Sequence, residues 1–124
     1  MNYPKNIEEI KKLAEEIKLD VKYLLGEKYK GDLWLPSVES LPDNIVFNVG
    51  GILDLNSVKS FPDNIKFNIG NNLNLRSVKS LPSNIVFNVG GYLNLNSVRS
   101  LPANFIFNIG GNLWLLSVQT LSNM

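Results

Sequence analysis

The chain has 124 residues, enough for one small domain, and its 12 lysines and arginines against 11 acidic residues leave a net charge of +1. This balance gives no reason to expect a polyanionic partner. Cysteine and histidine are both absent, which excludes disulfides, thiolate metal sites and the commonest general base.

The first thirty residues predict an amphipathic helix. Apart from the adjacent pair Leu13 and Ala14, its apolar residues fall three and four apart, with lysine and glutamate between them: Ile7, Ile10, Leu13, Ala14, Ile17, Val21 and Leu24. Pro4 and Asn6 stand where a helix begins, Gly26 supplies a stop, and Asp20 is placed to cap a second short helix. We interpret residues 1–30 as an α-helical cap that covers the end of the structure that follows.

The segment LAEEIKLDVKYLL within this region resembles a bacterial helix-turn-helix, with Ala14 and Leu24 in its packing positions. Lys18 occupies the place where that motif has glycine, and no third helix is predicted, so the cap is favoured over DNA recognition.

The N-terminus also lacks the pattern of a signal peptide, and no run of about 18 apolar residues occurs. We therefore expect cytoplasmic residence, in the producing or the host cell, and no membrane association.

From residue 31 onward a unit of twenty residues repeats without insertion, and its copies begin at Gly31, Gly51, Asn71, Gly91 and Gly111. Counted from these residues, positions three and five are leucine, position eight is valine, and positions fifteen, seventeen and nineteen are apolar in the full copies. Spacing of two predicts two strands per coil, and Ser, Pro-x-Asn and Gly-Gly segments predict corners. The sequence therefore predicts a mainly β fold, a parallel β-solenoid of about 4–5 coils over residues 31–124, in one structural domain with the cap.

Equivalent residues of successive coils are then expected to stack about 4.8 Å apart. The phenylalanines at position seventeen should form a row inside the solenoid: Phe47, Phe67, Phe87 and Phe107. The asparagines that follow them should form a row outside: Asn48, Asn68, Asn88 and Asn108.

The pattern GG-x-L-x-L followed by L-P-x-N resembles a bacterial and phage repeat of twenty residues, and the match runs from Gly31 onward. It is more distantly similar to bacterial leucine-rich repeats, although Val58 stands near the place of that family's asparagine. The resemblance implies a solenoid with an interaction role and carries over no catalytic residue.

The residues themselves also offer no catalytic set. Asp43 and Asp63 stand at a corner where the next coils have Ser83 and Ala103, and the repeated serines have no evident base. We therefore expect no enzyme activity, cofactor or metal. The hypothesis is a non-enzymatic scaffold that binds another protein, and its sharper form is a phage- or mobile-element-encoded inhibitor of a host defence protein.

Outward positions supply the candidate binding residues. Position nine carries the cations Lys59, Lys79 and Arg99, near which Arg76 and the outward aromatic Tyr92 are further candidates. This basic row also supports an alternative function, nucleic-acid binding. Ice binding is a third possibility, but it favours rows of threonine, whereas Thr120 is the one threonine in the repeats.

Position four is tryptophan in the first and last coils. We expect Trp34 to pack under the N-terminal helix, and we expect Trp114 to have no cover within the chain. The sequence stops fourteen residues into the fifth copy, which predicts a homodimer through the C-terminal coil. Its predicted interface residues are Leu113, Trp114, Leu116, Val118 and Leu121.

Overall fold

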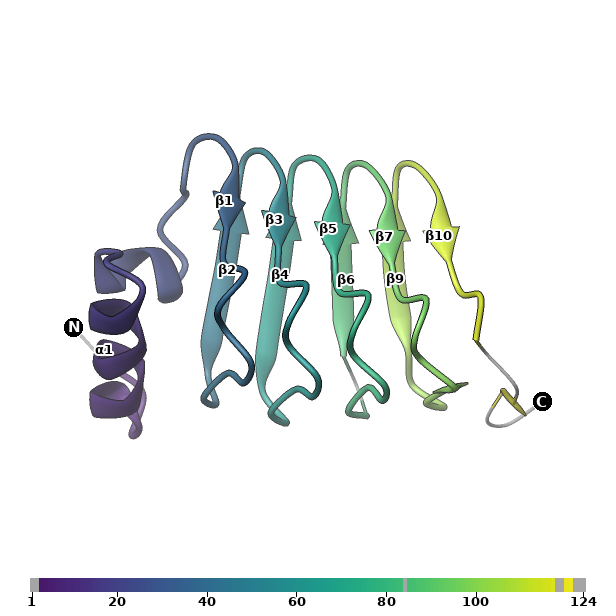
Figure 1. The fold of residues 1–124 in the computed structure, drawn as a ribbon, viewed down its shortest axis with the longest axis horizontal. Coiled ribbons are helices and arrows are strands. Elements are labelled where there is room, and N and C mark those ends of the chain that lie inside the picture. Colours follow the sequence, from purple (N-terminus) through teal and green to yellow (C-terminus); the bar gives the residue numbers. More distant parts are fainter. Residues whose placement is uncertain (1–2, 84, 118–119, 122–124) are drawn as a thin grey trace.

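The structure is a computed structural model that describes residues 3–83, 85–117 and 120–121. Its coils stand in a row behind an N-terminal helix, with the two chain ends at opposite ends of the row (Figure 1). All strand pairs are parallel and join residues twenty apart, so that Phe67 lies opposite Phe47 on one side and Phe87 on the other. The predicted parallel β-solenoid is confirmed.

Each of the first four coils contributes one strand to each of two sheets, and the fifth coil adds a strand to one of them. The long-strand sheet has the order β2 (Ile45–Val49), β4 (Ile65–Ile69), β6 (Val86–Val89) and β9 (Ile106–Ile109). The short-strand sheet has the order β1 (Leu33–Trp34), β3 (Leu53–Asp54), β5 (Leu73–Asn74), β7 (Leu93–Asn94) and β10 (Leu113–Trp114). A further pair joins β8 (Ser100–Leu101) to β11 (Thr120–Leu121).

The core lies between the two sheets and follows the predicted alternation. In β4 the side chains of Ile65, Phe67 and Ile69 are buried, whereas those between them are exposed. The ring of Phe67 stacks between those of Phe47 and Phe87, with centroids 5.8 and 5.5 Å apart. Phe107 is half-exposed because, among the described residues, β9 is the last strand of its sheet and no further strand of that sheet covers the ring.

In the three inner coils, the side chain at position four closes a turn directly after the strand of the short-strand sheet. The side-chain oxygen at position four accepts a hydrogen bond from the backbone N–H at position six in the three inner coils. The pairs are Asn56 to Asp54 at 3.0 Å, Arg76 to Asn74 at 3.2 Å and Asn96 to Asn94 at 3.0 Å. This is the Asx-turn, which explains why aspartate and asparagine recur there.

Glycines at position twenty allow the coils to approach closely at one corner. A Cβ atom on Gly70, Gly90 or Gly110 would overlap the carbonyl oxygen of the equivalent glycine one coil earlier. Gly50 has no such constraint, because a Cβ there would meet Lys28 Cε at 3.4 Å, which is ordinary contact. Coils two to four therefore need glycine at position twenty, because the carbonyl oxygen of the preceding coil leaves no room for a Cβ atom.

The N-terminal residues form α1 (Ile7–Glu16) and η1 (Val21–Leu24), a single 3₁₀ turn. Ile10, Leu13 and Ala14 join the same hydrophobic core as the first coil. As predicted, Asp20 caps the second element, where its side chain accepts a hydrogen bond from Lys22 N at 3.0 Å. Because η1 is one turn long, the helix-turn-helix interpretation has no recognition helix to enter a DNA groove.

Asn6 begins α1 as expected, but its side chain bonds to the first coil instead of the helix. Its amide donates to the carbonyl oxygen of Asp43 at 2.7 Å, and its oxygen accepts from the Asn44 amide at 2.9 Å. Tyr29 forms a parallel β-bridge with the edge of β2. Its backbone N–H donates to Asn48 O, and Gly50 N donates to Tyr29 O, both at 2.8 Å. The N-terminal edge of the long-strand sheet is therefore covered.

Over the described ranges, no helix is both long and apolar enough to cross a membrane.

Candidate protein-interaction surfaces

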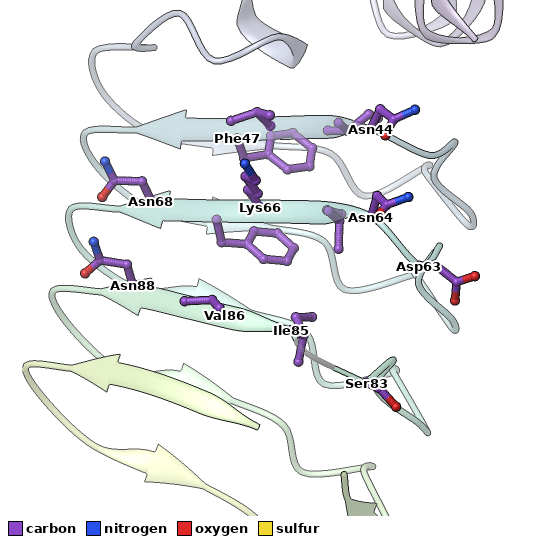
Figure 2. A pocket seen from close by; sticks show the side chains of 14 residues that line it. Asn44, Phe47, Asp63, Asn64, Lys66, Asn68, Ser83, Ile85, Val86 and Asn88 are labelled. Atoms are coloured by element: carbon purple, nitrogen blue, oxygen red, sulfur yellow. The ribbon is translucent and has the colours of Figure 1, made fainter. Parts of the chain in front are cut away.

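A groove of about 920 Å³ lies over β2, β4 and β6. Lys66 stands at its middle on β4, and Val86 stands on the next strand (Figure 2). Asn68 and Asn88 line one end of the groove. The other end is lined by corner residues, namely Asn44, Asp63, Asn64 and Ser83. The surface thus combines an apolar and cationic centre with polar ends.

The centre of this groove is accessible. Val86 is 46% exposed, Lys66 is exposed, and Val46 is partly buried. Within the part of the chain that the structure describes, one ion pair occurs, between Lys11 Nζ and Glu8 Oε1 at 3.8 Å, so the ammonium group of Lys66 is unpaired. This groove was not predicted from the sequence, although position sixteen, which faces outward, is apolar in three of its four copies.

The predicted basic row is present on the surface. Lys59, Lys79 and Arg99 are exposed, and the backbone N–H of each donates to the position-nine carbonyl of the preceding coil at 3.3 Å. In the described part of the chain, none of these three cations forms an ion pair. Arg76 is also exposed and lies in the turn that precedes Lys79.

Tyr92 does not join the basic row. Its ring stacks on the indole of Trp114, with centroids 4.5 Å apart and an interplanar angle of 7°. The expectation that Trp114 lacks cover within the chain is therefore wrong, because Tyr92 covers one face of the indole. The contact is diagonal, from position two of one coil to position four of the next, so a comparison of equivalent positions does not reveal it.

The expectation that Trp34 packs under the N-terminal helix is also wrong, because Trp34 is 57% exposed. Helix α1 lies across the end of the first coil, and Trp34 stands on the outer face of the short-strand sheet. Position six of this coil is Pro36, which has no N–H for an Asx-turn acceptor to bond. Position four is therefore not needed for the turn, and tryptophan is tolerated there.

The residues predicted for a dimer interface lie at the C-terminal end. Leu116 is exposed and Leu113 is partly buried. Val118 lies outside the described residues, and only the backbone of Leu121 is described, in register with Leu101.

No family model, curated protein or solved structure matches this chain.

Proposed function

We propose that the protein is a non-enzymatic scaffold that binds another protein through the groove over β2, β4 and β6. The observation that carries the proposal is the composition of this groove, in which an accessible apolar centre at Val46 and Val86 lies between rows of asparagine. Protein interfaces combine an apolar centre with a polar rim in the same way. Strand pairing fixes the backbone that carries these side chains, so little backbone conformational entropy is lost on binding.

The groove also indicates the chemistry of its partner. Lys66 is an unpaired cation between two valines, which favours a partner segment with one carboxylate flanked by apolar side chains. The amides of Asn68 and Asn88 can donate and accept hydrogen bonds at one end of such a segment.

Affinity capture from the producing cell and its host, followed by mass spectrometry, tests this proposal. The baits are the unaltered protein, Lys66→Glu, Val86→Glu and the matched control Lys59→Glu, which reverses an exposed lysine outside the groove. We expect a protein that the unaltered bait and Lys59→Glu retain and that both groove variants lose. Equal capture by all four baits, no specific capture, or turnover of a substrate by the protein would contradict the proposal.

The sharper form of the proposal is an inhibitor of a host defence protein, encoded by a phage or mobile element. Support for it is the small rigid scaffold, which suits occlusion of a partner's surface. Identification of the captured partner tests this form, since its activity should fall when the groove is occupied and recover with Val86→Glu.

A second function, nucleic-acid binding, is favoured by the row of unpaired cations at Lys59, Lys79 and Arg99. Neighbouring cations of this kind can contact successive phosphates, and such binding weakens steeply with salt. A gel-shift titration at about 50 mM salt with duplex and single-stranded probes tests it. Binding that Lys79→Glu abolishes would support this function, whereas the absence of any shift would remove it.

A further inference from the structure

The groove over β2, β4 and β6 runs across the strands, along the axis of the solenoid. Its floor is formed by position sixteen of successive coils, where Val46 lies opposite Lys66 and Val86 follows on the next strand. Ile106 pairs with Val86 on β9 and is 57% exposed, so it continues this row. The row therefore reads apolar, cationic, apolar, apolar, with one side chain about every 4.8 Å along the axis.

This spacing matches one face of an α-helix. Side chains at i, i+3, i+7 and i+10 of a helix lie at about 0, 4.5, 10.5 and 15 Å along its axis. The four side chains of the row lie at about 0, 4.8, 9.6 and 14.4 Å, so each pair agrees to about 1 Å. In an extended segment, side chains on one face are about 6.6 Å apart, and the fourth would pass the end of the row by about 5 Å, which is more than one coil.

The width of the floor also suits a helix. Asn68 lines the groove on one side, and Asn64, at the corner before β4, lines it on the other (Figure 2). These two residues are four positions apart along the same coil, which is about 13 Å in an extended chain. A helix with its side chains is about 10–12 Å across. A single extended chain takes the width of one strand, about 4.8 Å, and would leave more than half of the floor uncovered.

The face of the sheet offers no backbone groups to a bound segment. The backbones of β2, β4 and β6 are paired with one another in register. An extended segment that crosses these strands would leave its own N–H and C=O groups without backbone partners, since strand addition requires a sheet edge. A helix forms its backbone hydrogen bonds internally and needs only side-chain contacts from the sheet.

We propose that the occupant of this groove is an α-helix of the partner protein that lies along the solenoid axis. Counted from the side chain that meets Val46, the helix presents a carboxylate at i+3, toward Lys66, and apolar side chains at i, i+7 and i+10. Lys66 forms no ion pair among the described residues, so its ammonium group is available to that carboxylate. This inference rests on the proposed function, which makes the groove the binding site.

Fluorescence anisotropy with labelled peptides of about sixteen residues tests the proposal, because helices of this length are only marginally stable alone and gain helicity when bound. One peptide places leucine at i, i+7 and i+10 and glutamate at i+3, with alanine and glutamine elsewhere. A second places the glutamate at i+7 and a leucine at i+3, which presents the same pattern in the opposite chain direction. A third has the same composition but places these four residues at i, i+2, i+4 and i+6. We expect one of the first two to bind and to gain helical circular dichroism, and the third to bind more weakly.

Variants of the protein place the bound peptide on the row. Lys66→Glu should weaken binding about tenfold or more, and replacing the peptide's glutamate by lysine should restore it, which a purely structural effect of the variant would not allow. Ile106→Glu should also weaken binding, whereas the matched control Lys59→Glu, an exposed lysine outside the groove, should leave it unchanged.

Four results would overturn the proposal. They are equal or tighter binding of the third peptide, binding without a gain in helicity, equal binding by Lys66→Glu, and no binding of either helical peptide at about 1 mM. Affinity capture of a partner by the groove does not depend on the conformation of these peptides. A captured partner together with any of the four results would therefore reject the helix and leave the proposed function standing.

Discussion

Phe87 and Phe107 occupy the same position in successive coils, but only Phe87 is enclosed. Phe87 is 0% exposed, and its ring lies 5.5 Å from that of Phe67 and 5.9 Å from that of Phe105. Phe107 is 48% exposed and contacts the ring of Phe105 at 4.9 Å. The two residues therefore allow the same substitution to be compared inside the stack and at its open end.

Replacement of Phe87 by alanine should lower the free energy of unfolding by about 3–5 kcal/mol, because an enclosed cavity remains. Full burial of the ring accounts for about 1.5–3 kcal/mol of this, and each aromatic pair adds about 0.5–1.5 kcal/mol. Phe107→Ala removes about half of the burial and one pair, and it leaves no enclosed cavity. We expect a loss of about 1–3 kcal/mol there.

Urea unfolding followed by circular dichroism and tryptophan fluorescence measures both losses. Trp34 and Trp114 report on the first and last coils, so single-tryptophan variants show whether the two ends unfold together. Equal losses for Phe87→Ala and Phe107→Ala would show that stacking between coils does not enclose the aromatic row as described.

Three further predictions concern the corners and the cap. Gly90→Ala should destabilise the fold by about 1–3 kcal/mol through overlap with the Gly70 carbonyl, whereas Gly50→Ala should change stability by less than about 0.5 kcal/mol; similar urea midpoints would contradict this. Asn74→Ala should cost about 1 kcal/mol by leaving Arg76 N without its acceptor, and exposed Asn88→Ala much less, as thermal unfolding would measure. Deletion of residues 1–30 should cause aggregation by uncovering β2 and the core; a monomeric product with an unchanged melting temperature would contradict the cap.

The repeat period determined most of what could be predicted about the fold. A period of twenty residues places equivalent residues in register, and alternation of apolar residues assigns Phe67 to the inside and Asn68 to the outside. These two patterns were sufficient because each coil contacts its neighbours in the same way.

Features that depend on one particular coil were harder to predict. Trp34 is exposed because it stands on the outer face of β1, whereas α1 lies across the end of the first coil, and hydrophobic periodicity does not contain the placement of the helix. The stack of Tyr92 on Trp114 joins different positions of adjacent coils, so rows of equivalent residues do not show it. The groove over β4 depends on how neighbouring rows combine into a surface, which requires the relative placement of the strands.

The constant register between coils has a consequence for how such a gene can change. An in-frame duplication or loss of one twenty-residue unit between Asn71 and Gly91 would leave each glycine at position twenty opposite a glycine and each phenylalanine at position seventeen opposite a phenylalanine. The neighbouring repeats are similar in sequence, which favours unequal recombination between them. Such an event would change the distance between the N-terminal cap and the last coil by about 4.8 Å while leaving both ends intact. Related chains are therefore expected to differ in length by multiples of twenty residues, and insertions of other lengths should fall in the N-terminal cap.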